Sequence, residues 1–289
     1  MPTIEVQEES PAVSFDVQFW GVRAQVATPG KDTIRYGGNT SCVEMRIGDV
    51  RLVFDGGTGL RTLGNSLLKQ MPVEAHLFFT HCHWDRIQGF PFFIPAFIPI
   101  NHFHIYGAAA SDGSPFKQRL SKQMLGPNFP VPIQVMQSRL EFHNLEVGSK
   151  HQLAGDVTVE TYMLNEEQCS LGYRICDRGR TVVYAAAIDC YPEQPHPNLL
   201  RLAENADLLI LAITDTSAPL GTPELTVTTD DSPWRKQVEL AKAVGAKQLI
   251  LSLHNPDHSD DFLDRLESEV RLVFSQASLA REGMIIDIA

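Results

Sequence analysis

The sequence has few cysteines, no long uninterrupted apolar run and fewer basic than acidic residues. Its five cysteines form no CxxC pair, so a cysteine-based zinc site is not expected. The most apolar stretch, residues 90–100, is interrupted by three prolines, which argues against a membrane-spanning helix. Residues 1–11 carry three glutamates and no basic residue, so we expect no signal peptide and a flexible tail at residues 1–13. These absences favour a cytoplasmic protein with reduced thiols.

The charge balance is acidic, with 24 basic against 35 acidic residues and a formal net charge of −11. An acidic surface repels phosphate backbones, so broad nucleic-acid binding is not expected. The 289 residues, 43% of them hydrophobic, are enough to bury a full core. No long linker and no internal repeat interrupts the chain, so residues 14–289 are expected to form a single domain.

Hydrophobic periodicity changes along the chain. Strand patterns dominate the first half, around one amphipathic helix at 59–69, and helices alternate with strands in the second half. The predicted strands are 15–20, 42–47, 51–54, 73–79, 157–163, 173–176, 181–187, 207–213 and 248–253. The other predicted helices are 197–204, 232–244 and 259–274. This order predicts an α/β (α+β) fold with two mixed sheets sandwiched between helices.

One loop motif carries possible metal chemistry. His81, His83 and Asp85 directly follow a predicted apolar strand, in the segment Thr-His-Cys-His-Trp-Asp-Arg. Imidazole and carboxylate groups at this spacing are ligands that zinc accepts. Taken alone, the same residues could be ordinary polar loop residues. The preceding strand and the following glycine favour a metal site.

Longer motifs resemble a known family. The chain is similar to the metallo-β-lactamase superfamily, in the branch of ribonuclease Z-like enzymes and phosphodiesterases. The similarity rests on FWGVR at 19–23, RYGGNTSC at 35–42, FDGGTG at 54–59, LGYR at 171–174 and PDHSDDFLD at 256–264. The resemblance implies an αββα sandwich with a two-metal site, whose first ligands come from an HxHxDH motif.

The site residues implied by this resemblance are only partly present. His81, His83 and Asp85 match the motif, and several other positions depart from the family pattern. Arg86 and Glu166 each stand where the family has a histidine. Ala187 stands in place of the bridging aspartate, with Asp189 nearby, and Asp231 lies in a segment that is His-Ser-Thr-Trp in relatives. Leu253, or its neighbour His254, stands in place of the last histidine. We expect Arg86 to pair with leftover carboxylates of Asp85, Glu166 or Asp189. The alternative is that Arg86 points into solvent.

These departures shape the functional hypothesis. A two-metal hydrolase uses both ions to polarise its substrate and lower the pKa of a water molecule, and Ala187 and Leu253 cannot supply ligands. We therefore expect a non-catalytic binding or regulatory protein without a cofactor. The alternative is a phosphodiesterase-type hydrolase with one zinc or iron ion at His81, His83 and Glu166. A third hypothesis is that the protein is a structural subunit of a larger assembly.

Partners follow from the same hypothesis. The retained cleft would bind a small phosphorylated ligand or a protein, and the resemblance makes a homodimer, or a heterodimer with an intact relative, plausible. No membrane association is expected. His102 and His104 flank Phe103 on a strand and are predicted to be structural. The remaining histidines lack ligand partners nearby in sequence and are predicted to be surface or capping residues: His76, His143, His151, His196 and His258.

Overall fold

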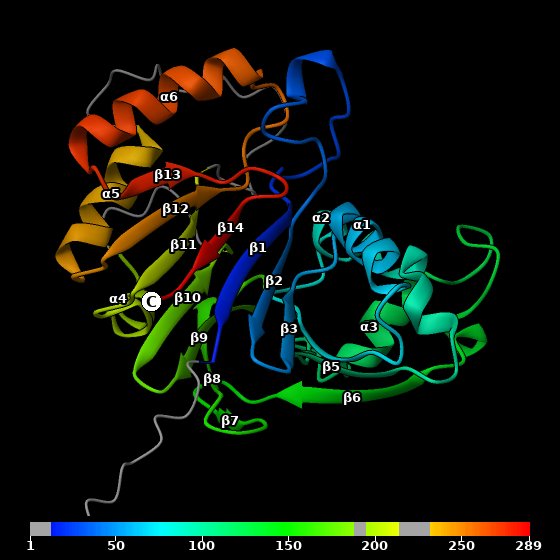
Figure 1. The fold of residues 1–289 in the computed structure, drawn as a ribbon. Helices are drawn as coiled ribbons and strands as arrows, with labels where there is room; N and C mark the ends of the chain where they lie inside the picture. The colour runs from blue at the N-terminus through cyan, green and yellow to red at the C-terminus, as the bar shows by residue number, and fades with distance from the viewer. Residues whose placement is uncertain (1–12, 188–194, 214–231) are drawn as a thin grey trace, which may run out of the picture.

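The computed structural model describes residues 13–187, 195–213 and 232–289. Apart from residue 13, the predicted N-terminal tail lies outside these residues, as do Asp189 and Asp231. The described chain forms two seven-stranded sheets that face each other, with helices on both outer sides (Figure 1).

The first sheet has the strand order β14-β1-β2-β3-β4-β5-β6. Its strands are β1 Phe15–Gly21, β2 Cys42–Ile47, β3 Val50–Phe54, β4 Glu74–Phe78, β5 His102–Ala108, β6 Arg139–Leu145 and β14 Ile285–Asp287. Strands β14, β1, β2 and β3 pair antiparallel, whereas β3, β4, β5 and β6 pair parallel. The sheet is therefore mixed, as predicted.

The second sheet has the order β13-β12-β11-β10-β9-β8-β7 and repeats this plan. Its strands are β7 Lys150–Gln152, β8 Thr158–Asn165, β9 Ser170–Asp177, β10 Arg180–Ala185, β11 Leu208–Ala212, β12 Gln248–Ser252 and β13 Ala277–Leu279. The hairpin strands β7 to β10 pair antiparallel, and β10 to β13 pair parallel.

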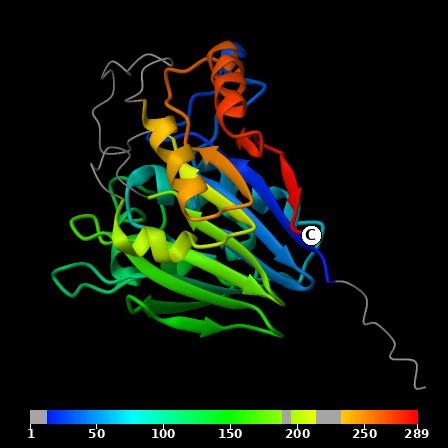
Figure 2. The ribbon, with the colours of Figure 1, turned by 90° about the vertical axis from the view of Figure 1, so that its left-hand side faces the viewer.

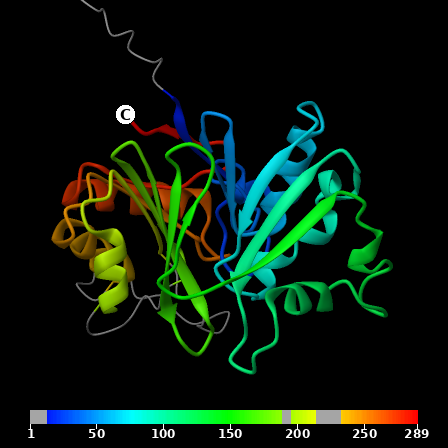
Figure 3. The same ribbon diagram turned by 90° about the horizontal axis from the view of Figure 1, so that it is seen from below.

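The helices form the outer layers. Those with α-helical turns are α1 Thr58–Leu67, α2 Trp84–Ile87, α3 Phe116–Lys122, α4 Pro197–Ala203, α5 Pro233–Ala243 and α6 Asp260–Val273. Short 3-10 turns lie at Lys31–Thr33, Phe90–Phe92, Ile94–Phe97 and Ile133–Val135. Helices α1 and α3 cover the first sheet, and α4, α5 and α6 cover the second, which Figures 2 and 3 show from two further sides. The predicted αββα sandwich is confirmed.

Aromatic side chains fill the space between the sheets. The Phe54 ring lies 5.5 Å from Phe78 and 5.4 Å from both Tyr173 and Tyr184, so residues of both sheets meet in one cluster. A second apolar cluster lies under α1, whose Leu60, Leu63 and Leu67 face the sheet at helical spacing. These two packed layers hold the loops at the strand ends in place.

Most predicted elements are present with small shifts at their ends. The elements that the periodicity did not indicate are α2, α3, β6, β7, β13 and β14, and β5 was indicated only as the strand that carries His102 and His104. No helix in the described part of the chain combines the length and apolar character needed to cross a bilayer.

Candidate metal centre

The loop after β4 brings the three motif residues together. His81 and His83 precede α2, and Asp85 lies in its first turn. Their donor atoms all lie within 4.8 Å of one another. The short spacing of the motif explains this, because the three side chains leave one tight turn between a buried strand and a helix.

His81 is prepared to accept a ligand through one nitrogen. Its Nδ1 lies 2.9 Å from Thr80 Oγ1, and Thr80 Oγ1 donates to Asp55 Oδ1 at 2.9 Å. Since that hydroxyl proton is committed to the carboxylate, His81 Nδ1 must carry a proton and donate to Thr80. The lone pair is then on Nε2, which is buried and has no hydrogen-bond partner among the described residues. Metal-ligating histidines are commonly fixed in this way.

The protonation of the two histidines also suits metal binding. Burial lowers the pKa of His81 well below its ordinary value, and Arg86 lowers it further. Burial also lowers the pKa of His83, although Asp85 opposes this shift. Both rings are therefore neutral near pH 7, and neutral imidazole is the form that coordinates a metal.

Arg86 lies beneath this group and is fully buried. Its Nη1 donates to Asp55 Oδ2 at 3.0 Å, its Nη2 donates to Ala186 O at 3.1 Å, and its Nε lies 3.1 Å from Asp85 Oδ2. The expected pairing with Asp85 is present, and Arg86 does not point into solvent. Burial alone would lower the pKa of Arg86, but Asp85 and Asp55 outweigh burial and raise it. The guanidinium remains charged.

Asp55 is the partner that the motif did not indicate. This buried carboxylate accepts hydrogen bonds from Thr80 N at 2.8 Å, from Tyr184 Oη at 2.9 Å and from Arg86. Ser41 Oγ lies 2.8 Å from Tyr184 Oη and completes the chain of hydroxyls. Burial raises the pKa of Asp55, whereas Arg86 and the hydrogen bonds lower it. Because Arg86 keeps its proton, its charge favours the ionised form of Asp55, and the two residues form a charged pair.

The backbone holds the Asp55 loop against the motif. Gly56 N donates to Arg86 O at 2.6 Å, and Gly89 N donates to Gly56 O at 2.8 Å. A Cβ atom at Gly89 would lie only 1.9 Å from Gly57 O, so the close approach requires glycine. Asp55 itself has a φ of 60°, a backbone conformation that residues other than glycine rarely adopt. The pairing of Arg86 with Asp55 is therefore built into two tightly joined loops.

Asp85 is shared between this network and the histidines. Its Oδ2 accepts a hydrogen bond from Gln25 N at 3.2 Å and lies against Arg86 Nε. A metal ion would thus compete with an arginine for the same carboxylate. Within the described residues, two histidines and one partly engaged carboxylate fit one ion, as in 2-His-1-carboxylate sites, and do not fit two.

Other residues predicted for the former site lie apart from these donors. Glu166 is exposed in the turn between β8 and β9 and is not one of the three grouped donors. Ala187 is buried just beyond β10, where its carbonyl oxygen accepts from Ser170 Oγ at 3.0 Å. The position expected for the metal-bridging aspartate therefore carries only the methyl group of Ala187. The carbonyl oxygen of the neighbouring Ala186 accepts a hydrogen bond from Arg86.

The last predicted ligand position is also occupied by a residue that is engaged elsewhere. Leu253 is buried, with a φ of 61°. His254 donates through Nε2 to Ala280 O at 2.8 Å, and its ring meets Tyr36 edge-on at 5.5 Å. Burial lowers the pKa of His254 to about 3. Its contacts identify His254 as a core residue. The aliphatic side chain of Leu253 has no donor atom, so this position supplies no metal ligand.

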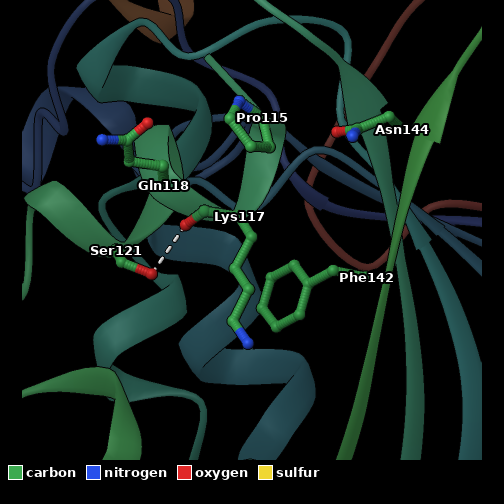
Figure 4. Close-up of a pocket in the computed structure, with 6 residues that line it drawn as sticks. All are labelled: Pro115, Lys117, Gln118, Ser121, Phe142 and Asn144. Atoms are coloured by element: carbon green, nitrogen blue, oxygen red, sulfur yellow. Dashed lines mark hydrogen bonds between the residues drawn. The ribbon is translucent and has the colours of Figure 1, made fainter.

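A hollow elsewhere on the surface has no comparable chemistry. It is lined by Pro115, Lys117, Gln118, Ser121, Phe142 and Asn144 (Figure 4). Lys117 Nζ lies 5.2 Å from the centre of the Phe142 ring. The lining residues Phe142 and Asn144 alternate with His143 along β6, so the hollow is on the helix-covered side of this strand. The lining has no histidine, cysteine or carboxylate, so the His81 group remains the candidate centre.

Comparisons with known proteins agree with this geometry. The sequence model of the β-lactamase superfamily domain matches residues 50–254. No curated protein matches the chain in sequence. Among solved structures, the metallo-β-lactamase fold protein YhfI from Bacillus subtilis is 19% identical with a TM-score of 0.66, over 95% of this chain and 99% of that one.

Two further structures share the fold. The short form of human tRNase Z is 21% identical, with a TM-score of 0.58, and the match covers 95% of this chain and 99% of that chain. Zinc-bound PqqB from Methylobacterium extorquens is 12% identical, with a TM-score of 0.68, over 94% of this chain and 100% of that one. Since the family model spans most of the chain and the αββα sandwich is present, this protein belongs to the metallo-β-lactamase superfamily.

Proposed function

We propose that this chain is a non-catalytic, binding or regulatory member of its superfamily, in which Arg86 supplies positive charge in place of a second metal ion. The observation that supports this most directly is the complete burial of Arg86 between the carboxylates of Asp55 and Asp85. A buried carboxylate without a counter-ion is costly. Arg86 provides that counter-ion permanently, whereas a metal ion can dissociate.

The same arrangement works against two-metal hydrolysis. In a two-metal site the ions clamp the attacking and leaving oxygens and generate a hydroxide near neutral pH. A guanidinium has five N–H donors and no lone pair, so it cannot coordinate a metal or activate water as a base. Its fixed charge, held 3.1 Å from Asp85 Oδ2, also repels a cation at that carboxylate.

The ligand proposed for the retained site meets two neutral imidazoles. His83 is exposed, and among the described residues His81 Nε2 has no partner, so its lone pair can accept a hydrogen bond, while the charge of Arg86 is already matched by Asp55 and Asp85. A small phosphorylated molecule with a hydroxyl or amino group, or a polar group of a partner protein, would complement these features, because it can donate to His81 and accept from His83. A second copy of this chain, or a relative with an intact site, would be such a protein partner.

A single-metal hydrolase is the second candidate, and the His81 tautomer favours it. With Nδ1 donating to Thr80, the free Nε2 lone pair is ready for a ligand. His81 and His83 would hold one zinc or iron ion, with Asp85 as the neighbouring carboxylate or Glu166 as the one that the sequence suggested. A bound zinc ion would lower the pKa of its water ligand. Thr80 and Asp55 would orient the His81 ring.

Metal content separates these two candidates. We expect the metal content of purified wild-type protein and of His81→Ala to differ by well under one zinc or iron ion per chain after mild dialysis. The reason is that Arg86 already pairs with the carboxylate of Asp85. Elemental analysis of both proteins measures this difference directly. A loss of about one ion in His81→Ala would support the single-metal hydrolase and contradict the non-catalytic assignment.

Activity provides an independent check. We expect no hydrolysis of bis-p-nitrophenyl phosphate, cyclic nucleotides or precursor tRNA above background, even with added Mn²⁺ or Zn²⁺, because the described donors cannot hold two ions. Asp85→Asn is the matched control, since it keeps the shape of the side chain and removes its charge. Turnover that disappears in Asp85→Asn would show that the site is catalytic.

A further inference from the structure

A second group of metal-binding side chains lies on the inner face of the first sheet. The parallel register places His76 beside His104 and Glu141, and the adjacent rows pair Glu74 with His102 and Tyr106 with His143. These side chains share one face because residues alternate along a strand with a period of two. Their sequence spacing predicts separate structural or surface histidines, whereas the strand register brings them together.

The distances within this group match those of a zinc site. His104 Nδ1 lies 3.4 Å from His143 Nε2 and 3.4 Å from Glu141 Oε2. Zinc bonds of about 2.0–2.1 Å in a tetrahedron place neighbouring ligand atoms about 3.3–3.4 Å apart. The donor atoms of His104, Glu141 and His143 all lie within 4.8 Å of one another. An ion could therefore enter between them with small side-chain movements.

We propose that His104, Glu141 and His143 form a second metal site, which binds zinc or a similar divalent transition-metal ion. Two imidazoles and one carboxylate are the ligand types that zinc selects, and a fourth position is left for solvent. This site is separate from the His81 loop and goes beyond the function proposed above. It would join the parallel strands β5 and β6 near the edge of the sheet.

The surroundings of the three ligands favour an ion. The His104 and His143 rings are stacked, with their centres 5.6 Å apart and their planes inclined by 26°. The His104 side chain is 16% exposed and Glu141 is 32% exposed, so solvent can reach the site. Arg139 pairs with Glu141 through Oε1, which leaves Oε2 facing His104.

Neighbouring groups offer a competing arrangement on the other side of His104. His104 Nε2 lies 3.4 Å from Glu74 Oε1, and His102 Nδ1 lies 3.7 Å from the same oxygen. Glu74 is 65% exposed, so fixing it would cost more side-chain entropy than fixing Glu141. The distance of 3.7 Å from His102 Nδ1 to Glu74 Oε1 is also longer than the 3.4 Å from His104 Nδ1 to Glu141 Oε2 and to His143 Nε2. We therefore assign the ion to the side of His143.

The site is also distinct from the motif loop in space. The His81 group follows the carboxyl end of β4, whereas His104 lies near the amino end of β5. Between them the rings of Phe78 and Tyr106 stack at 4.4 Å. A zinc ion at one group therefore shares no ligand with the other, and substitutions can test them separately.

Zinc titration of the full chain tests the proposal. Calorimetry and Co²⁺ absorption spectroscopy would compare wild type, His143→Ala, His102→Ala and His81→Ala, with His151→Ala as the matched control for removing a nearby histidine. We expect wild type to bind about one Zn²⁺ with a tetrahedral Co²⁺ spectrum. His143→Ala should weaken this binding by more than about tenfold. His102→Ala, His81→Ala and His151→Ala should retain it.

Several results would overturn this assignment. Absence of zinc binding in folded wild type, or retention of full affinity in His143→Ala, would reject the site. Loss in His102→Ala alone would move the ion to Glu74, and loss in His81→Ala alone would place it in the motif loop. If His143→Ala does not fold, His143→Gln and the zinc-induced shifts of the His104 and His143 ring nitrogens in wild-type NMR spectra give the same decision.

Discussion

Replacing Arg86 with methionine is expected to lower the free energy of unfolding by about 3–5 kcal/mol, the usual cost of breaking a buried ion pair from one side. Arg86 is fully buried, and its loss would leave Asp55 facing a low-polarity core without its cation. Methionine keeps much of the volume, so cavity formation contributes little to the loss. Urea unfolding at pH 7 measures the change.

A double-mutant cycle shows whether the charge pair causes this loss. Asp55→Asn removes the stranded charge, so the double variant Arg86→Met, Asp55→Asn should lose less than the sum of the single variants. Arg23→Met is the matched control. Arg23 is equally buried, but it donates to the backbone carbonyls of Gly37, Asn255 and His258. It should therefore show little coupling to Asp55→Asn. Additive losses for Arg86 and Asp55 would refute the charge-replacement role of Arg86.

Acidification is expected to destabilise the protein between about pH 6.5 and 5, partly through His254. Burial holds the pKa of His254 at about 3, whereas an unfolded histidine has a pKa of about 6.5. Below the unfolded pKa, the unfolded chain binds a proton that the native chain excludes. The free energy of unfolding therefore falls as pH falls, by up to about 1.4 kcal/mol per pH unit for each such histidine. His81 shifts in the same direction.

His254→Gln isolates this contribution. Glutamine can still donate to Ala280 O, and it does not titrate. At pH 8 the variant reports only the altered packing against Tyr36. Between pH 6.5 and 5 the stability difference from wild type should shift in favour of the variant by up to about 2 kcal/mol. A difference that is the same at pH 5 and pH 8 would show that His254 is not buried as a neutral ring.

The alternating and helical hydrophobic patterns predicted most of the sandwich. The strand at 15–20 became β1, and the leucines of the helix at 59–69 became the buried face of α1. The segment Arg139–Leu145 also alternates, with Leu140 and Phe142 on one face, but its other face carries charged and polar residues, so its hydrophobic signal is weak. Strands β13 and β14, with three residues each, are too short for a periodic signal. His196 was predicted as a possible cap, and it does cap α4.

The fold class and the closeness of His81, His83 and Asp85 were predictable from the sequence, because periodic patterns and a single short loop depend on neighbours along the chain. Only the tertiary structure showed that Arg86 pairs with Asp55, and that His104 faces Glu141 and His143. These contacts join strands or loops that are separated by roughly thirty to forty residues. The parallel strand register and the packing of loops at the strand ends determine which residues meet in these contacts. Neither can be read from the spacing of residues along the chain.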